Sequence, residues 1–261
     1  MRSSKTRRNW TREETILAFE LYCKTPFGKI HADNPKIIEL AKLIGRTPAA
    51  VSLKMSNLAH LDPALQDRNV AGMSHGSKMD AVVFGEFCDD WQTLSYEAQK
   101  IKAKLQDTEI QKIIDIGDID ALPPGKYREH EIKIRAGQYF FRSAVLGSYG
   151  MKCCVTGLNN SELLIASHIK PWSVSDEKTE RTNPSNGLCL NALHDKAFDK
   201  GYITITPDFK IIVSAELKKT EMDDKTRLWL LSYNNKEITL PDQFKPDRRF
   251  IEYHNDLIFK G

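Results

Sequence analysis

The first part of the chain repeats apolar positions at the spacing of a helix. Apolar residues recur every three or four positions over 11–23, 34–45 and 47–61. A capping box opens the first segment, and a proline stands near the start of each of the other two, where a missing N–H costs little. The pattern predicts three short helices, the second and third joined by a tight turn at Gly45.

The middle of the chain mixes helical pattern with residues that break helices. Residues 63–85 are richer in Gly, Ser and Asp and predict an exposed connection. Residues 84–116 combine a Trp91 anchor with a long charged stretch at mixed helical spacing, which predicts a helix that bridges two domains or pairs with its copy in a dimer. The segment 118–126 contains Pro-Pro-Gly and is the clearest linker, so we expect the domain boundary there.

Beyond the linker the pattern changes to short apolar runs. Residues 163–166 and 188–190 each fit a strand, and a turn-forming Asn-Pro-Ser-Asn-Gly segment precedes the second. A helical pattern follows over 192–200 and stops at Gly201. Two β-branched runs within 202–213, separated by Pro-Asp, predict a hairpin. The predicted order is strand, loop, strand, helix and hairpin.

Two histidines stand at marked places in this pattern. His168 closes the first predicted strand, shortly before a proline, and His194 lies on the helix after the second strand. Asp195 and Asp199 follow on that helix, and Asn186 lies in the turn. A lone histidine at a strand end is more often structural than catalytic. A hydrophobic core, however, does not require two histidines, an asparagine and two aspartates in this arrangement, so these residues are the candidates for an active site.

Three segments carry a resemblance to a known family. Ser-His-Ile-Lys-Pro-Trp, Asn-Pro-Ser-Asn-Gly-Leu-Cys-Leu and Leu-His-Asp-Lys-Ala-Phe-Asp-Lys-Gly resemble the HNH nucleases, whose ββα-metal motif folds around one divalent cation, and in particular the restriction-type branch. The resemblance covers residues 150–214. Arg-x-Gly-Gln-x-x-Phe-Arg also resembles the helix before the motif, with Arg135, Gln138 and Arg142 on one face that can meet phosphates. A surface helix with its charges in water is the alternative.

The resemblance implies roles for three residues. His168 resembles the general base that takes a proton from the attacking water, a task that suits a neutral imidazole with a pKa near ~6.5. Asn186 resembles the middle Asn, which ties the loop and orients the histidine. His194 resembles the helix histidine that binds the metal, which in turn stabilises charge on the scissile phosphate. The implied cofactor is one divalent ion, Mg²⁺ or Mn²⁺.

One departure from the family concerns the metal ligands. Many HNH nucleases carry Asp or His directly before the base, whereas this chain has Ser167, a poor ligand. Where some nucleases have another histidine after the helix histidine, this chain has Phe198. We therefore expect the cation to be held by His194, phosphate oxygens and water, with Asp195 or Asp199 helping.

A targeting element for such a nuclease is predicted in the N-terminal region. Helix, Gly-containing turn and helix over residues 40–51 form a helix-turn-helix pattern, which resembles the DNA-binding segments of sigma-like and Myb-like regulators. In those segments the helix after the turn enters the major groove. The polar candidates for phosphates or base edges are Arg46, Thr47, Ser52, Lys54 and Asn57. A small helical bundle that serves only as a scaffold is the alternative.

Composition restricts the classes of protein. The chain has 261 residues, of which 41% are hydrophobic and 28% charged, as is typical of a soluble globular protein with room for two modest domains. A formal net charge of +3 permits nucleic-acid binding without arguing for it. No apolar run approaches the ~20 residues of a membrane span and the start lacks a signal-peptide core, so a cytoplasmic protein is expected. The five cysteines form no Cys-x-x-Cys pair, which favours buried thiols over a zinc site.

Together these features predict an α+β protein with two domains. Residues 1–120 form a helical, HTH-like DNA-targeting region, and residues 127–261 form an HNH nuclease domain with flanking helices and a β-hairpin. The resemblance implies a type II-like restriction endonuclease that hydrolyses double-stranded DNA as a homodimer. A modification-dependent, McrA-like enzyme is a variant of this hypothesis. The competitor is a DNA-binding regulator with an inactive HNH fold, and an RNA nuclease is a weaker rival.

Overall fold

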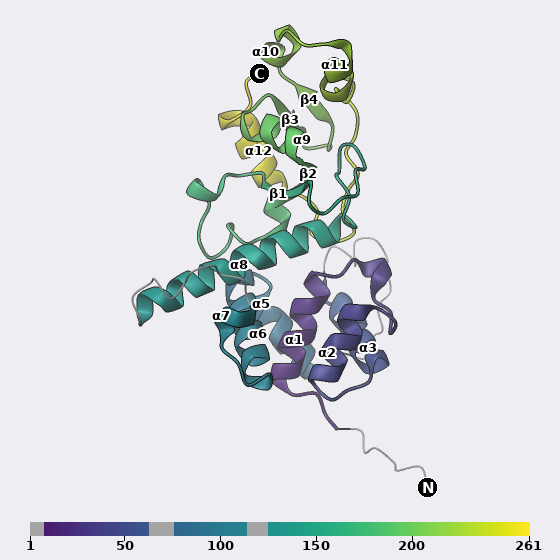
Figure 1. Cartoon of the computed structure of the whole chain (residues 1–261), viewed down its shortest axis with the longest axis vertical. Coiled ribbons are helices and arrows are strands. Elements are labelled where there is room, and N and C mark those ends of the chain that lie inside the picture. The colour runs from purple at the N-terminus through teal and green to yellow at the C-terminus, as the bar shows by residue number, and fades with distance from the viewer. Residues whose placement is uncertain (1–7, 63–75, 114–124) are drawn as a thin grey trace.

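The protein consists of a helical unit and a mixed unit stacked along its long axis (Figure 1). The computed structural model describes residues 8–62, 76–113 and 125–261. The helical unit contains α1 (Arg12–Cys23), η1 (Phe27–Lys29), α2 (Pro35–Leu43), α3 (Pro48–Ala59), α5 (Lys78–Phe87), α6 (Trp91–Leu105) and α7 (Ile110–Ile113). No helix within the described ranges is long and apolar enough to cross a membrane.

The mixed unit is built around two small antiparallel sheets. Its elements are α8 (Lys126–Ser148), β1 (Leu164–His168), η3 (Trp172–Val174), η4 (Pro184–Asn186), β2 (Gly187–Asn191), α9 (Ala192–Asp199), β3 (Ile203–Ile205), β4 (Ile211–Val213), α10 (Ala215–Lys219), α11 (Asp224–Leu231) and α12 (Arg248–Leu257). β1 pairs with β2, with Leu164 opposite Asn191 and His168 opposite Gly187. β3 pairs with β4. The predicted order of strand, loop, strand, helix and hairpin is confirmed.

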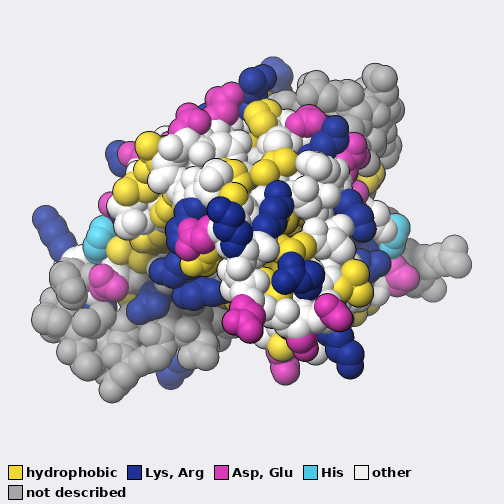
Figure 2. All heavy atoms as spheres, turned by 90° about the horizontal axis from the view of Figure 1, so that it is seen from above, with side chains coloured by type: hydrophobic (Ala, Val, Ile, Leu, Met, Phe, Trp, Pro, Cys, Tyr) yellow, Lys and Arg dark blue, Asp and Glu magenta, His cyan; other side chains and the backbone are white. Residues whose placement is uncertain are grey.

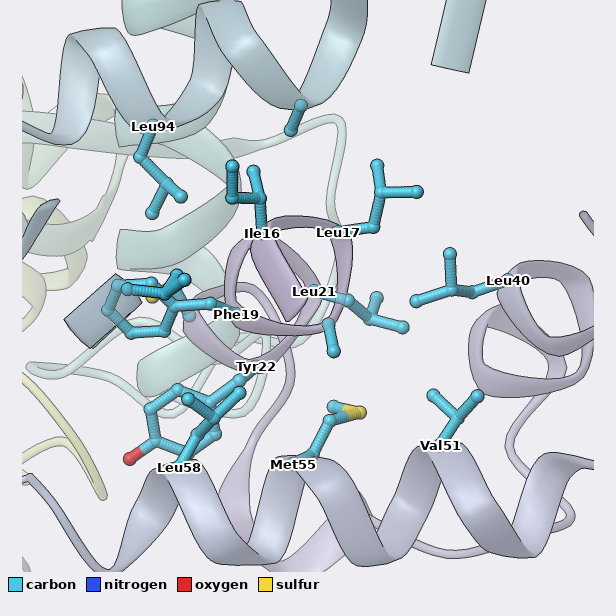
Figure 3. Close-up of a cluster of buried hydrophobic side chains, with 14 of the residues drawn as sticks. Ile16, Leu17, Phe19, Leu21, Tyr22, Leu40, Val51, Met55, Leu58 and Leu94 are labelled. Atoms are coloured by element: carbon cyan, nitrogen blue, oxygen red, sulfur yellow. The ribbon is translucent and has the colours of Figure 1, made fainter. Parts of the chain in front are cut away.

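Helix α1 is the centre of the helical core. The predicted capping box is present, because the Thr11 side chain accepts from the Glu14 N–H and the Glu14 carboxylate accepts from the Thr11 N–H. Leu40 of α2, Met55 of α3 and Leu94 of α6 approach α1 from different sides (Figure 3). Every residue of α1 after its first turn is buried. A helix that is enclosed in this way loses the one-sided apolar stripe of a surface helix.

Helix α8 belongs to both hydrophobic cores. Phe140 and Ala144 pack in the core of the helical unit, whereas Phe141 and Val145, each one position further along, pack in the core of the mixed unit. Successive residues on a helix point about 100° apart, so a single helix can face two cores at once. The two units are therefore joined through shared packing on α8, which crosses between them in Figure 1.

The predicted organisation of the middle of the chain is partly wrong. In place of one helix over 84–116, the described residues form α5, α6 and α7. The chain turns between α5 and α6 because the Asp90 carboxylate accepts from the Thr93 N–H and so starts a new helix. α5 also occupies the end of the expected exposed connection over 63–85. Most of that connection and nearly all of the expected linker at 118–126 lie outside the described residues, so the domain boundary stays a prediction.

Candidate active site

His168 is held by aromatic stacking and by one hydrogen bond at the end of β1. Its imidazole stacks on Phe141 of α8, with ring centroids 3.9 Å apart and planes 11° apart, and meets Trp172 edge-on at 5.6 Å. Its Nε2 lies 2.8 Å from the carbonyl oxygen of Arg181. A carbonyl only accepts hydrogen bonds, so Nε2 carries the proton and Nδ1 is left with a free lone pair. Burial lowers the pKa of His168, against a smaller opposing effect of the Arg181 carbonyl, so the ring is neutral at neutral pH.

An open hollow with a volume of about 340 Å³ lies beside His168. Gln138 and Arg142 of α8 line it, which confirms that they share the helix face predicted from the sequence. Arg135, on the same face, donates to the Gln138 side chain at 3.4 Å. Gly187 allows β2 to lie against α8 here, because a Cβ at that position would meet Val145 at 2.4 Å.

Asn186 ties together the loop that follows β1. Its side chain is fully buried. Its Oδ1 accepts from the Lys170 N–H at 2.8 Å, and its Nδ2 donates to the carbonyls of Lys170 at 3.1 Å and Glu180 at 3.3 Å. Glu180 directly precedes Arg181, whose carbonyl holds His168. The bonds of Asn186 therefore fix the backbone on which the orientation of the imidazole depends.

His194 lies on the first turn of α9, in contact with α11. Its Nδ1 is 3.1 Å from the Oδ1 of Asn191, which also accepts from the His194 N–H. The ring is 1% exposed and lies near Trp229, at 6.0 Å, and Tyr233, at 5.5 Å. Burial lowers its pKa to about 4. Its Nε2 has no partner with hydrogen-bond geometry, although the Trp229 backbone is close enough to oppose part of that shift.

Two carboxylates of α9 lie one helical turn apart, with the hydroxyl of Ser167 close to the first. Burial raises the pKa of both Asp195 and Asp199, and the charge of Asp195 raises that of Asp199 further. Ser167 lowers the pKa of Asp195 slightly, yet its own buried Oγ has no partner with full hydrogen-bond geometry. Asp199 is exposed, whereas Asp195 is half-buried. Within the described ranges, no three His, Cys, Asp or Glu side chains are grouped closely enough to hold a metal ion.

Two of the predicted DNA-contacting residues are used in internal ion pairs. Arg46 lies over the Trp10 ring at 4.1 Å and pairs with Glu14 at 2.7 Å. Lys54 pairs with Asp80 at 2.5 Å. Both side chains are less than a tenth exposed, at 9% and 4%. This geometry does not favour the predicted contacts of either residue with DNA, because each cation is already neutralised and withdrawn from solvent.

The other three candidates on α3 have different surroundings. The Thr47 side chain accepts from the Ala50 N–H and caps α3, and the Ser52 hydroxyl donates to the Ile30 carbonyl at 3.1 Å. Asn57 is partly buried. The helices α2 and α3 and the turn between them are present as predicted. A helix-turn-helix role in DNA binding stays a prediction.

In the mixed unit, an antiparallel strand pair is followed directly by a helix, and a histidine closes the first strand. Residues 153–206 match the family model described as HNH endonuclease. Residues 153–206 therefore form an HNH endonuclease domain, which confirms the family resemblance over that part of the chain.

Comparisons of the whole chain add little to this assignment. A search of the curated proteins found no match. Among solved structures, the chain is similar to the modification dependent TagI restriction endonuclease, with 20% sequence identity and a TM-score of 0.32. That similarity covers 45% of this chain and 37% of the other.

The sequence did not reveal two features that hold the His168 side chain. Nothing in the sequence marks the Arg181 carbonyl, because a backbone acceptor leaves no residue signature. Phe141 stands within the Arg-x-Gly-Gln-x-x-Phe-Arg segment, so its position was visible although its stacking was not. The spacing of Asp195 and Asp199 was also visible, since residues four apart share a helix face.

Proposed function

We propose that this protein is a metal-dependent endonuclease that hydrolyses phosphodiester bonds of double-stranded DNA, with His168 as the general base. The state of His168 carries the proposal. Its ring is neutral, its tautomer is fixed by the Arg181 carbonyl, and it lines an open hollow beside Arg142. A neutral imidazole with one free lone pair is the form that can accept a proton from water. A restriction setting, in which a homodimer cuts both strands, is part of the same proposal.

We infer that Asp195 and Asp199 would hold a divalent cation, Mg²⁺ or Mn²⁺, with Ser167 beside them. These ions prefer oxygen ligands, and a bound cation would offset the burial that raises the pKa of both carboxyls. The Ser167 Oγ, which lacks a well-formed hydrogen bond, faces the same place. Phosphate oxygens and water would complete the shell. When bound, the ion stabilises negative charge on the scissile phosphate and the leaving oxygen.

His194 fits a supporting role better than the metal-binding role expected from the resemblance. The nitrogen that a metal would need, Nε2, is buried beside Trp229 of α11. The other nitrogen is engaged with Asn191, the residue that caps α9. We therefore assign His194 to holding the first turn of α9, which places Asp195.

The remaining steps use groups of the chain. A water molecule donates its proton to Nδ1 of His168 while its oxygen bonds to phosphorus and the bond from phosphorus to the leaving oxygen breaks. The imidazolium that forms keeps its Nε2–H on the Arg181 carbonyl, which favours the charged ring. Asn186 holds the loop that carries this carbonyl. Arg142 lines the hollow from α8, where a guanidinium can bind a phosphate oxygen.

The test is cleavage of plasmid DNA, unmodified and cytosine- or adenine-methylated, with Mg²⁺ or Mn²⁺. We expect His168→Ala to lower the rate by about 10²–10⁴-fold, the usual contribution of a general base. His31→Ala, which removes an exposed histidine of the helical unit, is the matched control and should cut like the wild type. A requirement for methylation would identify the modification-dependent variant. DNA binding without cutting at any metal concentration would instead support a regulator, and preferential cutting of structured RNA would refute the DNA assignment.

A further inference from the structure

A cleft with a volume of about 520 Å³ lies where the helical unit meets α8. Its lining includes Lys24, Lys29 and Lys36 from the helical unit and Tyr139 and Arg142 from α8. The base of the cleft is closed by direct contact between the two units. A Cβ on Gly147 of α8 would lie only 2.7 Å from the carbonyl oxygen of Lys24. The two walls of the cleft are therefore fixed relative to each other by packing.

The cleft and the hollow beside His168 share one lining residue. Arg142 lines both spaces. Its guanidinium donates to the carbonyls of Leu164 at 2.9 Å and Ser161 at 3.2 Å, which fixes the group at the junction. A guanidinium has five N–H donors, so others remain for a phosphate oxygen. Arg142 is therefore placed to contact a nucleic-acid strand that lies across both spaces.

The charge of the cleft suits a polyanion. Four of its lining residues are cationic, and none of the described residues lining it is Asp or Glu. Lys24 is neutralised by a buried ion pair with Glu20. Lys29 and Lys36 are exposed and form no ion pair with any residue in the described part of the chain. By contrast, the end of the molecule seen from above mixes Lys and Arg with Asp and Glu (Figure 2).

Tyr139 adds an aromatic surface to this cationic cleft. The residue is 54% exposed. The ammonium of Lys24 lies 4.6 Å from the centre of its ring, which restricts the ring without covering it. Exposed aromatic rings beside cations are typical of surfaces that bind nucleic acids, where bases or sugars pack on the ring and phosphates on the cations.

We propose that this cleft binds the DNA backbone next to the cut phosphate, with Lys29 and Lys36 contacting phosphates and Tyr139 packing on the sugar or base between them. The proposal rests on the proposed function for the nature of the substrate. It gives the helical unit a direct part in substrate binding. This part does not require α3 to enter the major groove.

The experiment measures binding of the full chain to a fluorescent linear DNA duplex in EDTA, so that no cutting occurs, at a series of salt concentrations. Each neutralised phosphate contributes about 0.9 to the slope of log affinity against log salt concentration. We expect Lys29→Ala/Lys36→Ala to lower the magnitude of this slope by about 2 and to weaken binding equally for unrelated sequences. Tyr139→Ala should weaken binding with little change in slope.

The matched control is Lys219→Ala/Lys225→Ala. Both lysines are exposed, form no ion pair with a described residue and lie outside the cleft, in the mixed unit. This variant has the same change in net charge and should keep the wild-type slope to within about half a unit. The control therefore separates a local phosphate contact from a general loss of positive charge.

Several outcomes decide between the proposals. An unchanged slope in the cleft variant, an equal loss in the control, or no binding of DNA by the wild type would each overturn the inference. Tighter binding of a structured RNA that depends on the same lysines would assign the cleft to RNA and overturn the DNA proposal. DNA binding that depends on Lys29 and Lys36 without metal-dependent cutting would leave the cleft established and refute the proposed nuclease. Metal-dependent cutting by a protein whose DNA binding does not depend on Lys29 and Lys36 would support the proposed nuclease and refute the role of the cleft.

Discussion

Replacing Asn186 by alanine is expected to destabilise the protein and to slow cleavage separately. The side chain makes three well-formed bonds within the loop, one with the Lys170 N–H, one with the Lys170 carbonyl and one with the Glu180 carbonyl. Asn186→Ala removes all three: the Lys170 N–H loses its acceptor, whereas the Lys170 carbonyl keeps its bond from the Ser175 hydroxyl and the Glu180 carbonyl keeps its bond from the Asn183 N–H. Because one of the two hydrogen bonds to the Glu180 carbonyl is lost, the neighbouring Arg181 carbonyl is held less firmly against His168.

The size of the effect on stability follows from these contacts. Each lost hydrogen bond costs about 1 kcal/mol net, and a partner left buried and unsatisfied costs somewhat more. Three such bonds give a loss of about 2–4 kcal/mol in the free energy of unfolding. For a chain of this size, that corresponds to a fall in Tm of about 4–16 °C. Asn186→Asp keeps the Oδ1 acceptor for the Lys170 N–H, and at low pH its protonated carboxyl keeps one of the two donors, so its loss should be intermediate there.

Thermal unfolding followed by circular dichroism gives the Tm, and cleavage is measured at a temperature where every variant is folded. Asn183→Ala is the matched control, since Asn183 lies in the same turn and its Oδ1 accepts only from the Ser185 N–H. We expect that control to lose about 1 kcal/mol and to cut at close to the wild-type rate. The reasoning is refuted if Asn186→Ala melts within about 2 °C of the wild type, or if the two variants slow cleavage equally.

Three further predictions concern charge. Burial lowers the pKa of His168 below 6.5, so kcat/KM should rise with pH, with a midpoint below 6.5, and should be constant around neutral pH. A midpoint above 7 would contradict this prediction. Mg²⁺ or Mn²⁺ at a hundredfold excess over its Kd should add about 2.7 kcal/mol to the free energy of unfolding and raise Tm by about 5–11 °C. Asp195→Asn/Asp199→Asn should abolish that rise in Tm. Without metal this variant should be no less stable than the wild type, because the pKa of both carboxyls is raised and their charged forms lower the free energy of unfolding at a pH above those values. A rise in Tm that persists in the variant would point to other ligands. Trp229→Ala should move the pKa of His194 from about 4 towards 6.5, as followed by NMR of its ring protons. The wild type should lose stability as the pH falls from 6.5 towards 4, because His194 is protonated in the unfolded chain before it is protonated in the folded one. The Trp229→Ala variant should lose less stability over this range. An unchanged titration of His194 would contradict its burial beside α11.

The sequence predicted the local structure of the site well because its signals act over a few residues. A strand that ends at His168, a turn at Asn186 and a helix that stops at Gly201 all follow from neighbouring residues, and all three are present. Gly201 has a φ of +71°, the left-handed conformation that ends a helix most easily with glycine. These predictions succeeded because turn chemistry and apolar spacing agreed with the tertiary fold.

The surroundings of the same residues could not be predicted, because they depend on segments distant in the chain. The family resemblance implies that His194 binds the metal, but the packing of Trp229 and Tyr233 beside it, from more than thirty residues later in the chain, is set by the tertiary fold. Arg46 and Lys54 have the types of side chain that contact DNA, but buried carboxylates of other helices pair with them. A pattern of residue types does not show which cations a fold will neutralise internally.

Helix α8 connects the two parts of the molecule at the point where the proposed chemistry takes place. On one side Phe141 stacks on His168, and on the neighbouring side Phe140 stacks on Trp91 of the helical unit at 5.8 Å. A shift of α8 that relieves one contact must therefore disturb the other, because consecutive residues on a rigid helix move together. The orientation of the proposed base thus depends on the packing of the helical unit, and that unit contributes to the active site whether or not α3 reads DNA.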